Sequence, residues 1–318
     1  MSSKKIPDPS FKGDYEYTYT ILTPTYQRSH TLPRVYESLN SQTYTDFEWV
    51  IIDDNSDDGT KNLVKRWQSE ANFPIQFIKQ NPNKSGKHRG FNIGVERARG
   101  RFIYRLDSDD EILPESLEIF REYWNEIPIY KQNEYSGIRA LYVDSDDNIV
   151  GDEFPKSPMD TNQLELRYIH QVDGDKPEIL RTRLLRKFPF PDVETRNVPE
   201  GVVWDKIGEE YTLRCVNEVV EILHDDSPDR LTERGLPDGQ KKGHVVWHQH
   251  RLNTQINWFI HRPTILIQSA IHLTRFSFHS KIGLRKQYKM LSWPAIILWM
   301  LFIPIGTLLY IRDKLLSG

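Results

Sequence analysis

A regular alternation of short apolar segments and helical segments constrains the fold of this chain more than any other feature. Four apolar segments of strand length lie at residues 18–25, 47–54, 75–80 and 101–107. Segments with helical spacing of apolar residues follow them, at 30–42, 59–71 and 86–99 and from Pro114 onward. This alternation predicts an α/β fold with a mostly parallel central sheet and helices on both faces. Such sheets bind ligands beyond the carboxyl ends of their strands.

The pattern weakens beyond this region. Residues 136–144 fit one more strand, whereas residues 145–240 show little periodicity. The sequence therefore predicts three parts: a polar leader at 1–17, an α/β domain at 18–240 and a tail at 241–318.

Charge is divided unevenly along the chain. Residues 1–240 carry a net charge of −13, whereas residues 241–318 carry +10 and hold a single acid, Asp313. This asymmetry indicates that the tail contacts an anionic partner, either nucleic acid or membrane lipid. The single cysteine, Cys215, excludes a disulfide framework and a cysteine-cluster metal site within one chain. Residues 1–19 contain no apolar run, so no signal peptide is expected.

The apolar content of the tail favours lipid over nucleic acid. Residues 290–311 form a run of 22 residues without a charge, which would be about 33 Å long as a helix. Trp293 and Tyr310 stand near its ends, where interfacial aromatic residues belong. Basic residues flank the run on both sides: Lys281, Arg285, Lys286, Lys289, Arg312 and Lys314. We therefore expect an anionic membrane surface as a partner and no nucleic acid.

Three arrangements of this run remain open. It fits a single membrane crossing, a re-entrant or in-plane hairpin, and a buried helix of a soluble protein. Pro304 and Gly306 would kink a helix at its middle. Upstream, residues 258–281 mix apolar side chains with arginine and lysine, as a basic amphipathic segment on a membrane surface does.

Acidic clusters follow two of the predicted strands. Residues 53–60 read DDNSDDGT, and residues 107–110 read DSDD. At the ends of parallel strands they would face one crevice, where carboxylates suit Mg²⁺ or Mn²⁺ together with a diphosphate. An aspartate of the first cluster would alternatively accept a hydrogen bond from a nucleobase. Taken singly, each cluster also fits a solvated turn.

A basic turn lies between the two clusters. Residues 83–90, NKSGKHRG, lead into a helix, so backbone N–H groups and basic side chains would form an anion site. The spacing of a Walker loop is absent. A basic helix start on the surface is the plain alternative.

These segments together carry a resemblance to a known family. TILTPTYQR, VIIDDNSDDGT, Asn92-Ile93-Gly94 and GRFIYRLDSDD followed by LPESL occur in this order. The chain resembles the inverting family-2 glycosyltransferases with the GT-A fold, of the bacterial polysaccharide and lipopolysaccharide type. The resemblance covers about residues 18–125, which would be the nucleotide-binding half, and continues more weakly through 126–240, the acceptor half.

The resemblance implies roles for individual residues. Asp54 would read the nucleobase, Asp107 would lie near the ribose or the donor sugar, and Asp109 would be the metal ligand, with Asp107 beside it. The expected cofactors are Mg²⁺ or Mn²⁺ and a UDP- or GDP-sugar. The full set of expected donor-binding residues is Pro24, Thr25, Tyr26, Arg28, Asp54, Ser56, Gly86, Lys87, Asn92, Asp107, Ser108 and Asp109.

Inverting transfer also needs a general base. The family supplies an acid after a later strand, often within a Glu-Asp pair. The nearest match here is VPEGVVWD at 198–205, so Glu200 is the expected base and Asp205 the second candidate. The stretch 223–227 adds His224 as a candidate metal or diphosphate ligand. Four aromatic residues are candidates for stacking on an acceptor or for ordinary packing: Trp204, Tyr211, Trp247 and Trp258.

The sequence thus predicts a membrane-associated inverting glycosyltransferase. It would move a sugar from a nucleotide donor to a glycan acceptor, lipid-linked as in cell-surface polysaccharide assembly. The alternatives are a polyprenyl-phosphate sugar transferase like the dolichol-phosphate mannose synthases, and a non-catalytic membrane scaffold. A basic flank on the cytoplasmic side would place the catalytic domain in the cytoplasm, anchored to the inner membrane by the C-terminal tail.

Overall fold

The computed structural model describes residues 14–224 and 240–316. Most of the predicted leader, residues 1–13, lies outside this part. Within the described ranges nine strands form one sheet, in the order β3-β2-β1-β4-β8-β6-β9-β5, with β7 paired to β9. The strands are β1 (Tyr17–Thr25), β2 (Phe47–Asp53), β3 (Ile75–Lys79), β4 (Gly100–Arg105), β5 (Glu111–Ile112), β6 (Tyr135–Asp144), β7 (Met159–Thr161), β8 (Glu178–Arg181) and β9 (Thr212–Leu223).

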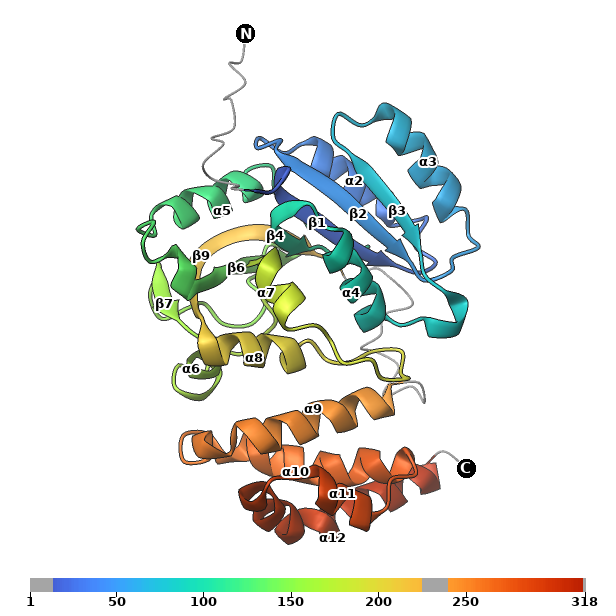
Figure 1. Ribbon diagram of the computed structural model, residues 1–318, viewed down its shortest axis with the longest axis vertical. Coiled ribbons are helices and arrows are strands. Elements are labelled where there is room, and N and C mark those ends of the chain that lie inside the picture. The colour runs from blue at the N-terminus through green and yellow to red at the C-terminus, as the bar shows by residue number, and fades with distance from the viewer. Residues whose placement is uncertain (1–13, 225–239, 317–318) are drawn as a thin grey trace.

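Helices cover both faces of the sheet (Figure 1). One face packs against α2 (Leu32–Asn40), α3 (Thr60–Glu70) and α5 (Ser116–Asn125). The other face packs against α4 (Lys87–Arg97), α7 (Thr182–Lys187) and α8 (Gly201–Glu210). The short α6 (Gln163–Tyr168) lies beside α8. Single 3₁₀ turns occur at η1 (Pro82–Lys84) and η2 (Gln132–Glu134).

Strand direction explains where the functional groups meet. Strands β1, β2, β3 and β4 are mutually parallel. Strand β8 is antiparallel to both β4 and β6, so β6 runs in the direction of β4, and β9 is parallel to β6. The carboxyl ends of β1, β2, β4, β6 and β9 therefore lie along one edge of the sheet.

The central strands are apolar on both faces, as buried parallel strands must be. In β2, Phe47, Trp49 and Ile51 point into the core beneath α2 and α3. The alternate residues Val50 and Ile52 point into the core beneath α4. Side chains alternate between faces along a strand, so a continuous apolar run fills both cores.

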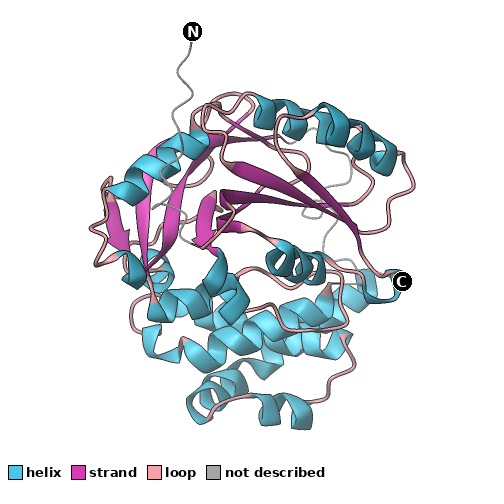
Figure 2. Ribbon diagram, turned by 45° about the horizontal axis from the view of Figure 1, so that its top comes forward, coloured by secondary structure: helices cyan, strands magenta, loops and turns pink. Residues whose placement is uncertain are grey.

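The tail forms a separate helical layer. It contains α9 (Lys241–Thr254), η3 (Ile256–Trp258), α10 (Pro263–His279), α11 (Leu284–Met290) and α12 (Trp293–Leu316). These helices share their own apolar core. Figure 2 shows the layer beneath the α/β body.

The predicted fold class is confirmed, and each predicted strand and helix of residues 18–125 lies within a few residues of its expected place. Strand 136–144 is found as β6. The pattern does not predict β5, β7, β8 or β9. Strands β5, β7 and β8 have two to four residues, which is too short for periodicity. Strand β9 has twelve residues but lies in the stretch 145–240, where the sequence shows little periodicity. The division of the chain at residue 240 stays a prediction.

Two expectations for the tail need correction. Part of the apolar side of the 258–281 segment does not lie on the surface: α10 buries Leu266, Leu273 and Phe276 within the tail core. The uncharged run is also not one helix. Met290 is the last residue of α11, and α12 begins at Trp293 and continues without a break through Pro304 to Leu316.

The contact of β6 with β8 leaves no room for a side chain at Gly137. A Cβ atom there would lie 1.8 Å from the backbone oxygen of Ile179. We expect Gly137→Ala to lower the free energy of unfolding by about 2–3 kcal/mol, because the two strands must separate. Chemical denaturation measures this. The matched control is Gly283→Ala, where nothing lies within 4 Å and little change is expected. Equal stability of the two variants would contradict this account.

Candidate active site

Four acidic residues from three segments lie at the carboxyl edge of the sheet. Asp54 follows β2, Asp107 and Asp109 follow β4, and Glu200 occupies the N-cap position of α8. Asp107 and Glu200 are far apart in the sequence, yet both carboxylates lie within 4 Å of the same two cations. The structure thus brings together the two acidic clusters and the expected base.

Lys87 and Arg105 form the bridge between Asp107 and Glu200. Lys87 Nζ lies 3.2 Å from Asp107 Oδ1 and 3.8 Å from Glu200 Oε1. Arg105 Nη1 lies 3.2 Å from Glu200 Oε1 and 3.7 Å from Asp107 Oδ2. We call these four residues the charge bridge. Two carboxylates can approach this closely only because the cations between them offset their repulsion.

The ion pairs of the charge bridge shift the pKa values of Asp107 and Lys87. Burial alone would raise the pKa of Asp107, but Lys87 and Arg105 outweigh burial and lower that pKa to about 2. Burial likewise opposes the charge on Lys87, and the two carboxylates outweigh it, so the pKa of Lys87 is raised. Asp107 and Lys87 are therefore charged near neutral pH.

Arg105 is the member of the charge bridge that the sequence analysis does not name. It precedes Asp107 by two residues at the end of β4, and residues two apart on an extended chain point to the same side. The sequence signal that could have identified Arg105 is an arginine two positions before the D-x-D motif.

Asp109 lies beside two arginines. Arg28 Nε lies 3.8 Å from Asp109 Oδ2, and Arg34 Nη1 donates a hydrogen bond of 2.8 Å to the backbone oxygen of Asp109. Thr31 Oγ1 donates to the backbone oxygen of Ser108 at 2.9 Å. The start of α2 therefore holds the D-x-D loop in place, and Arg28 reaches the site as expected.

Two buried acceptors at this edge have no hydrogen-bond partner. They are Thr25 Oγ1, at the end of β1, and Asp54 Oδ1, just after β2. Burial raises the pKa of Asp54, and the backbone N–H of Gly86 opposes that rise by bonding to the carboxylate. A buried polar atom without a partner costs free energy, so these atoms point to a ligand that supplies the missing donor.

Gly86 allows the basic turn to reach the charge bridge. Its φ of +133° is a conformation that other residues rarely adopt, and a Cβ atom would lie 2.8 Å from Thr195 O. The next residue, Lys87, donates its backbone N–H to Arg196 O at 2.9 Å. This close approach joins the start of α4 to the segment that carries Glu200.

Other predicted donor-binding residues line or brace the same edge. Pro24 lies within β1, and Tyr26, just after it, is 57% exposed. Ser56 accepts a hydrogen bond of 2.9 Å from the backbone N–H of Gln27, which ties the loop after β2 to the loop after β1. Ser108 is buried.

Asn92 is not brought into the site. Its amide Nδ2 donates to Phe190 O at 2.9 Å, and its Oδ1 accepts from Phe190 N at 3.0 Å. The side chain is therefore used in fastening α4 to the segment after α7.

Asp205 is also directed away from the charge bridge. Its side chain is fully buried and bonds to Arg167 Nη1 at 2.7 Å and to Gln255 Nε2 at 2.6 Å. Gln255 belongs to the tail, so this carboxylate joins α8 to the helical layer. It has no path to an acceptor hydroxyl, because a base must reach the proton that it removes.

His224 ends β9 beside the D-x-D loop. Its backbone N–H donates to Asp110 Oδ1 at 3.0 Å, and its imidazole contacts Glu111 at 3.1 Å and Ser145 at 3.3 Å. Burial, followed by Asp107 and Asp109, raises the pKa of Asp110 to about 7. Asp225 to Ser227 of the predicted stretch lie outside the described residues.

The carboxylates of Asp107 and Asp109 could hold a divalent metal only if a bound molecule, such as a diphosphate, supplied further oxygen atoms. In the described part of the chain, no three histidine, cysteine or carboxylate side chains are arranged to hold a metal by themselves. Asp107 and Asp109 offer partly exposed carboxylates, 34% and 20% accessible. Mg²⁺ commonly uses one or two carboxylates and completes its shell with phosphate oxygens and water. Asp109 is the expected ligand; its carboxylate faces Arg28, whereas that of Asp107 faces the two cations of the charge bridge.

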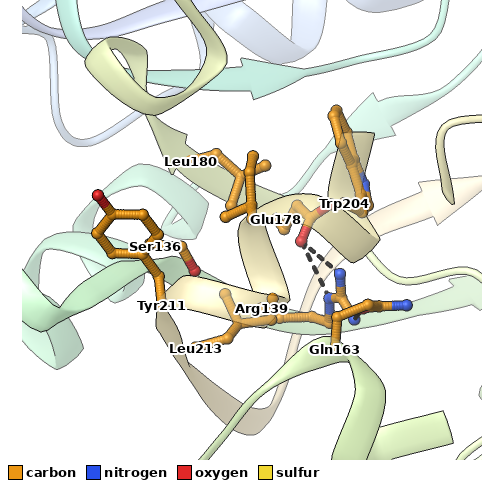
Figure 3. A pocket seen from close by; sticks show the side chains of 10 residues that line it. Ser136, Arg139, Gln163, Glu178, Leu180, Trp204, Tyr211 and Leu213 are labelled. Atoms are coloured by element: carbon orange, nitrogen blue, oxygen red, sulfur yellow. Dashed lines mark hydrogen bonds and ion pairs between the residues drawn. The ribbon is translucent and has the colours of Figure 1, made fainter. Parts of the chain in front are cut away.

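The candidate aromatic platforms are used in packing. Trp204 contacts Phe91 and Phe190, and Trp258 stacks on Tyr168 with ring centroids 5.5 Å apart. Figure 3 shows Trp204 and Tyr211 among the residues that line a small pocket, together with the Arg139–Glu178 ion pair. Trp247 lies against Gly201 and the Arg251 guanidinium. A separate polar cavity of about 180 Å³ is lined by residues that include Arg139, Arg167, Asp173, Asp175 and Lys176.

Comparison with known sequences finds one matching family model and several similar proteins. The family model described as Glycosyl transferase family 2 matches residues 20–187. A GalNAc(5)-diNAcBac-PP-undecaprenol β-1,3-glucosyltransferase of Campylobacter jejuni is 34% identical over 107 residues, which are 34% of each chain. The Escherichia coli enzyme WfgD, named as a UDP-Glc:α-D-GlcNAc-diphosphoundecaprenol β-1,3-glucosyltransferase, is 26% identical over 64% of this chain and 74% of its own.

Solved structures share the fold. TarS of Staphylococcus aureus in complex with UDP-GlcNAc has a TM-score of 0.62, with 16% identity over 90% of this chain and 79% of that one. A mannosyltransferase of Pyrobaculum calidifontis in complex with GDP-Man and Mn²⁺ has a TM-score of 0.51, with 15% identity over 97% of this chain and 90% of that one.

The burial of Asp205 generates a test that separates a structural from a catalytic role. Asp205→Ala should lower the free energy of unfolding by roughly 3 kcal/mol, because it leaves Arg167 without its buried partner. The kcat of the folded fraction should stay near that of the wild type. Glu210→Ala, which removes a half-exposed ion pair on the same helix, is the control and should cost under about 1 kcal/mol. A stable but inactive Asp205→Ala would instead favour catalysis.

Proposed function

Because this chain belongs to glycosyltransferase family 2, we propose that it transfers a sugar from a nucleoside-diphosphate donor to a lipid-linked glycan acceptor, with inversion. The observation that carries the proposal is the charge bridge. It joins the D-x-D carboxylate Asp107 to Glu200 through Lys87 and Arg105, at the edge that also holds Asp109 and the unpartnered Oδ1 of Asp54. A non-catalytic scaffold would have no need for this concentration of charge.

Asp54 and Thr25 would hold the nucleoside. Each presents a buried oxygen without a donor, and both uracil and guanine carry ring N–H groups. A UDP-sugar and a GDP-sugar therefore suit the site equally well. Tyr26, which is exposed beside them, would cover the base.

The basic side chains would receive the diphosphate. Lys87 stands at the first turn of α4, and Arg28 stands at the opposite wall beside Asp109. Backbone N–H groups at a helix start and cations on both sides favour an anion between them. Mg²⁺ or Mn²⁺ held by Asp109 and Asp107 would supply Lewis-acid stabilisation of the leaving diphosphate.

Glu200 would act as the general base. It takes the proton of the acceptor hydroxyl, the hydroxyl oxygen forms a bond to the anomeric carbon, and the bond from that carbon to the diphosphate oxygen breaks. Attack opposite to the leaving group inverts the configuration. Arg105 holds the Glu200 carboxylate at 3.2 Å and thereby positions it.

The proposed acceptor class rests on the relatives. Two of them are named for undecaprenol-diphosphate-linked glycans. This chain spans about a third of the Campylobacter relative, so the acceptor belongs to the proposal. The cavity beside Asp175 and Lys176 is a candidate for the acceptor sugar, because Asp175 lies close enough to Arg105 to influence its pKa. The expected location is the cytoplasmic face of the inner membrane.

Removing the proposed metal ligand should abolish metal-dependent transfer. For Asp109→Asn we expect turnover to fall by at least about a hundredfold, as for other groups that stabilise a developing charge. Nucleoside-diphosphate release from a panel of UDP- and GDP-sugars, with Mn²⁺, with Mg²⁺ and with EDTA, measures this. Full activity of the wild type in EDTA would contradict a metal role for this aspartate.

Replacing the proposed base should affect the chemical step alone. Glu200→Gln should lower kcat by about 10²–10⁴-fold and leave the KM for the donor within about twofold. The matched control is Glu194→Gln, on the same loop, whose side chain is 89% exposed. If Glu200→Gln turns over like the wild type, the base lies elsewhere.

A separate assay identifies the acceptor class. The enzyme is offered polyprenyl phosphate and, in parallel, a diphosphate-linked glycan, and the acceptor that receives the sugar is determined.

A further inference from the structure

Helix α12 presents an uninterrupted apolar face to the outside. Its exposed residues recur at helical spacing along one side, so they form a stripe rather than scattered positions. We call them the apolar face: Trp293, Ile297, Met300, Leu301, Ile305 and Leu308, each between 44% and 70% exposed. Contiguous exposed apolar surface of this kind marks a site of interaction.

The opposite side of α12 is packed against α10. Ala295 and Trp299 are buried in the tail core, and the Trp299 indole donates to Thr274 Oγ1 at 2.9 Å. At Gly306 the helices touch so closely that a Cβ atom would lie 2.5 Å from Ile271 O. Only 28% of the most apolar window of α12 is buried. The helix is therefore not the enclosed core helix of a soluble protein.

The single acid of the tail is neutralised within the tail. Asp313 accepts two hydrogen bonds from Arg275, at 2.5 and 2.9 Å, and contacts His279 at 3.0 Å. Because this carboxylate is paired, the surface of the tail is left with basic charge. No other aspartate or glutamate occurs between residues 241 and 318.

Basic residues stand beside the apolar face. The segment of α11 and its approach, directly before α12, exposes Lys281, Arg285, Lys286 and Lys289. The same segment exposes Leu284 and Tyr288, 41% and 48% accessible. Figure 1 shows α11 and α12 at the end of the molecule farthest from the sheet. Apolar side chains flanked by lysine and arginine match the chemistry of an anionic lipid surface.

We propose that the apolar face of α12 inserts into one leaflet of an anionic bilayer, with α12 lying in the plane of the interface rather than crossing the membrane. The basic residues of α11 contact the lipid headgroups. This inference rests on the structure of the tail and is independent of the proposed sugar transfer.

Packing within the tail opposes a crossing. A transmembrane α12 would have to leave α10, which would expose Leu266, Leu273 and Phe276 and separate Arg275 from Asp313. Carrying α10 along would bring Arg275 and His272 toward the hydrocarbon, at high cost. Helix α10 is also held to the body, because Arg262, just before it, pairs with Asp173 at 2.7 Å.

Vesicle flotation of the full chain tests whether the apolar face binds a lipid surface. The probes are vesicles of phosphatidylcholine with a quarter phosphatidylglycerol, and vesicles of phosphatidylcholine alone. We expect the wild type to float with the anionic vesicles and the double variant Leu301→Glu/Leu308→Glu to bind at least tenfold more weakly. Ile129→Glu/Tyr130→Glu is the control, since these residues are equally exposed on the body, at 78% and 76%, and it should bind like the wild type.

The charge contribution is tested separately. Arg285→Gln/Lys286→Gln/Lys289→Gln should weaken binding to anionic vesicles by tenfold or more and reduce its dependence on salt. Circular dichroism verifies that each variant is folded. Flotation of Leu301→Glu/Leu308→Glu equal to that of the wild type would overturn the proposal. A second result would also overturn it: the wild type forms a dimer in solution and does not bind vesicles, and Leu301→Glu/Leu308→Glu dissociates that dimer. The apolar face would then be a contact between two copies of the chain.

Chemical labelling of two positions tests whether α12 lies in the plane of the membrane. Lys281 and Lys314 flank the apolar run, and the native Cys215 is buried. In a Cys215→Ala background, Lys281→Cys and Lys314→Cys should both react with a membrane-impermeant maleimide added outside sealed vesicles. Protection of one of the two positions would show a crossing and overturn the in-plane arrangement. Neither measurement uses activity, so failure of the proposed reaction would leave this result standing.

Discussion

The pairing of Lys87 and Arg105 with Asp107 and Glu200 is the interaction on which the site depends. Two partly buried carboxylates from distant segments repel each other, and two cations from α4 and β4 bring them together. The same pairing keeps Asp107 ionised at neutral pH, with a pKa of about 2. A proposed base is thereby positioned next to the expected binding site of a diphosphate and its metal.

The fold provides the conditions for this pairing. Because β1, β2, β4 and β6 run in one direction, their carboxyl ends gather Thr25, Asp54 and Asp107 at one edge. Gly86 then lets the start of α4 approach the backbone of Thr195 and Arg196. The approach matters because Glu200 lies only four residues beyond Arg196, and Lys87 could not otherwise reach it.

Hydrogen bonds also join the body to the tail, and ion pairs within the tail shape its surface. Asp205, Arg167 and Gln255 link α8 and α6 to the end of α9, and Trp258 stacks on Tyr168 nearby. Within the tail, Arg275 and His279 neutralise Asp313. The outer side of α12 is left apolar and its flank basic. A surface with these properties would hold the body at a fixed orientation to a lipid layer, where a lipid-linked acceptor would be found.

The sequence by itself determined the layered α/β fold of residues 18–125, because strands buried on both faces and amphipathic helices have distinct periods. It also identified Asp54, Asp107, Asp109, Lys87 and Glu200 as candidates, through their types and their places after strands. Tertiary structure alone decided the rest. It directed Asp205 and Asn92 into internal contacts, added Arg105 to the site and packed α10 beneath α12. Which neighbours a side chain meets depends on contacts between distant segments, and local periodicity carries no information about those contacts.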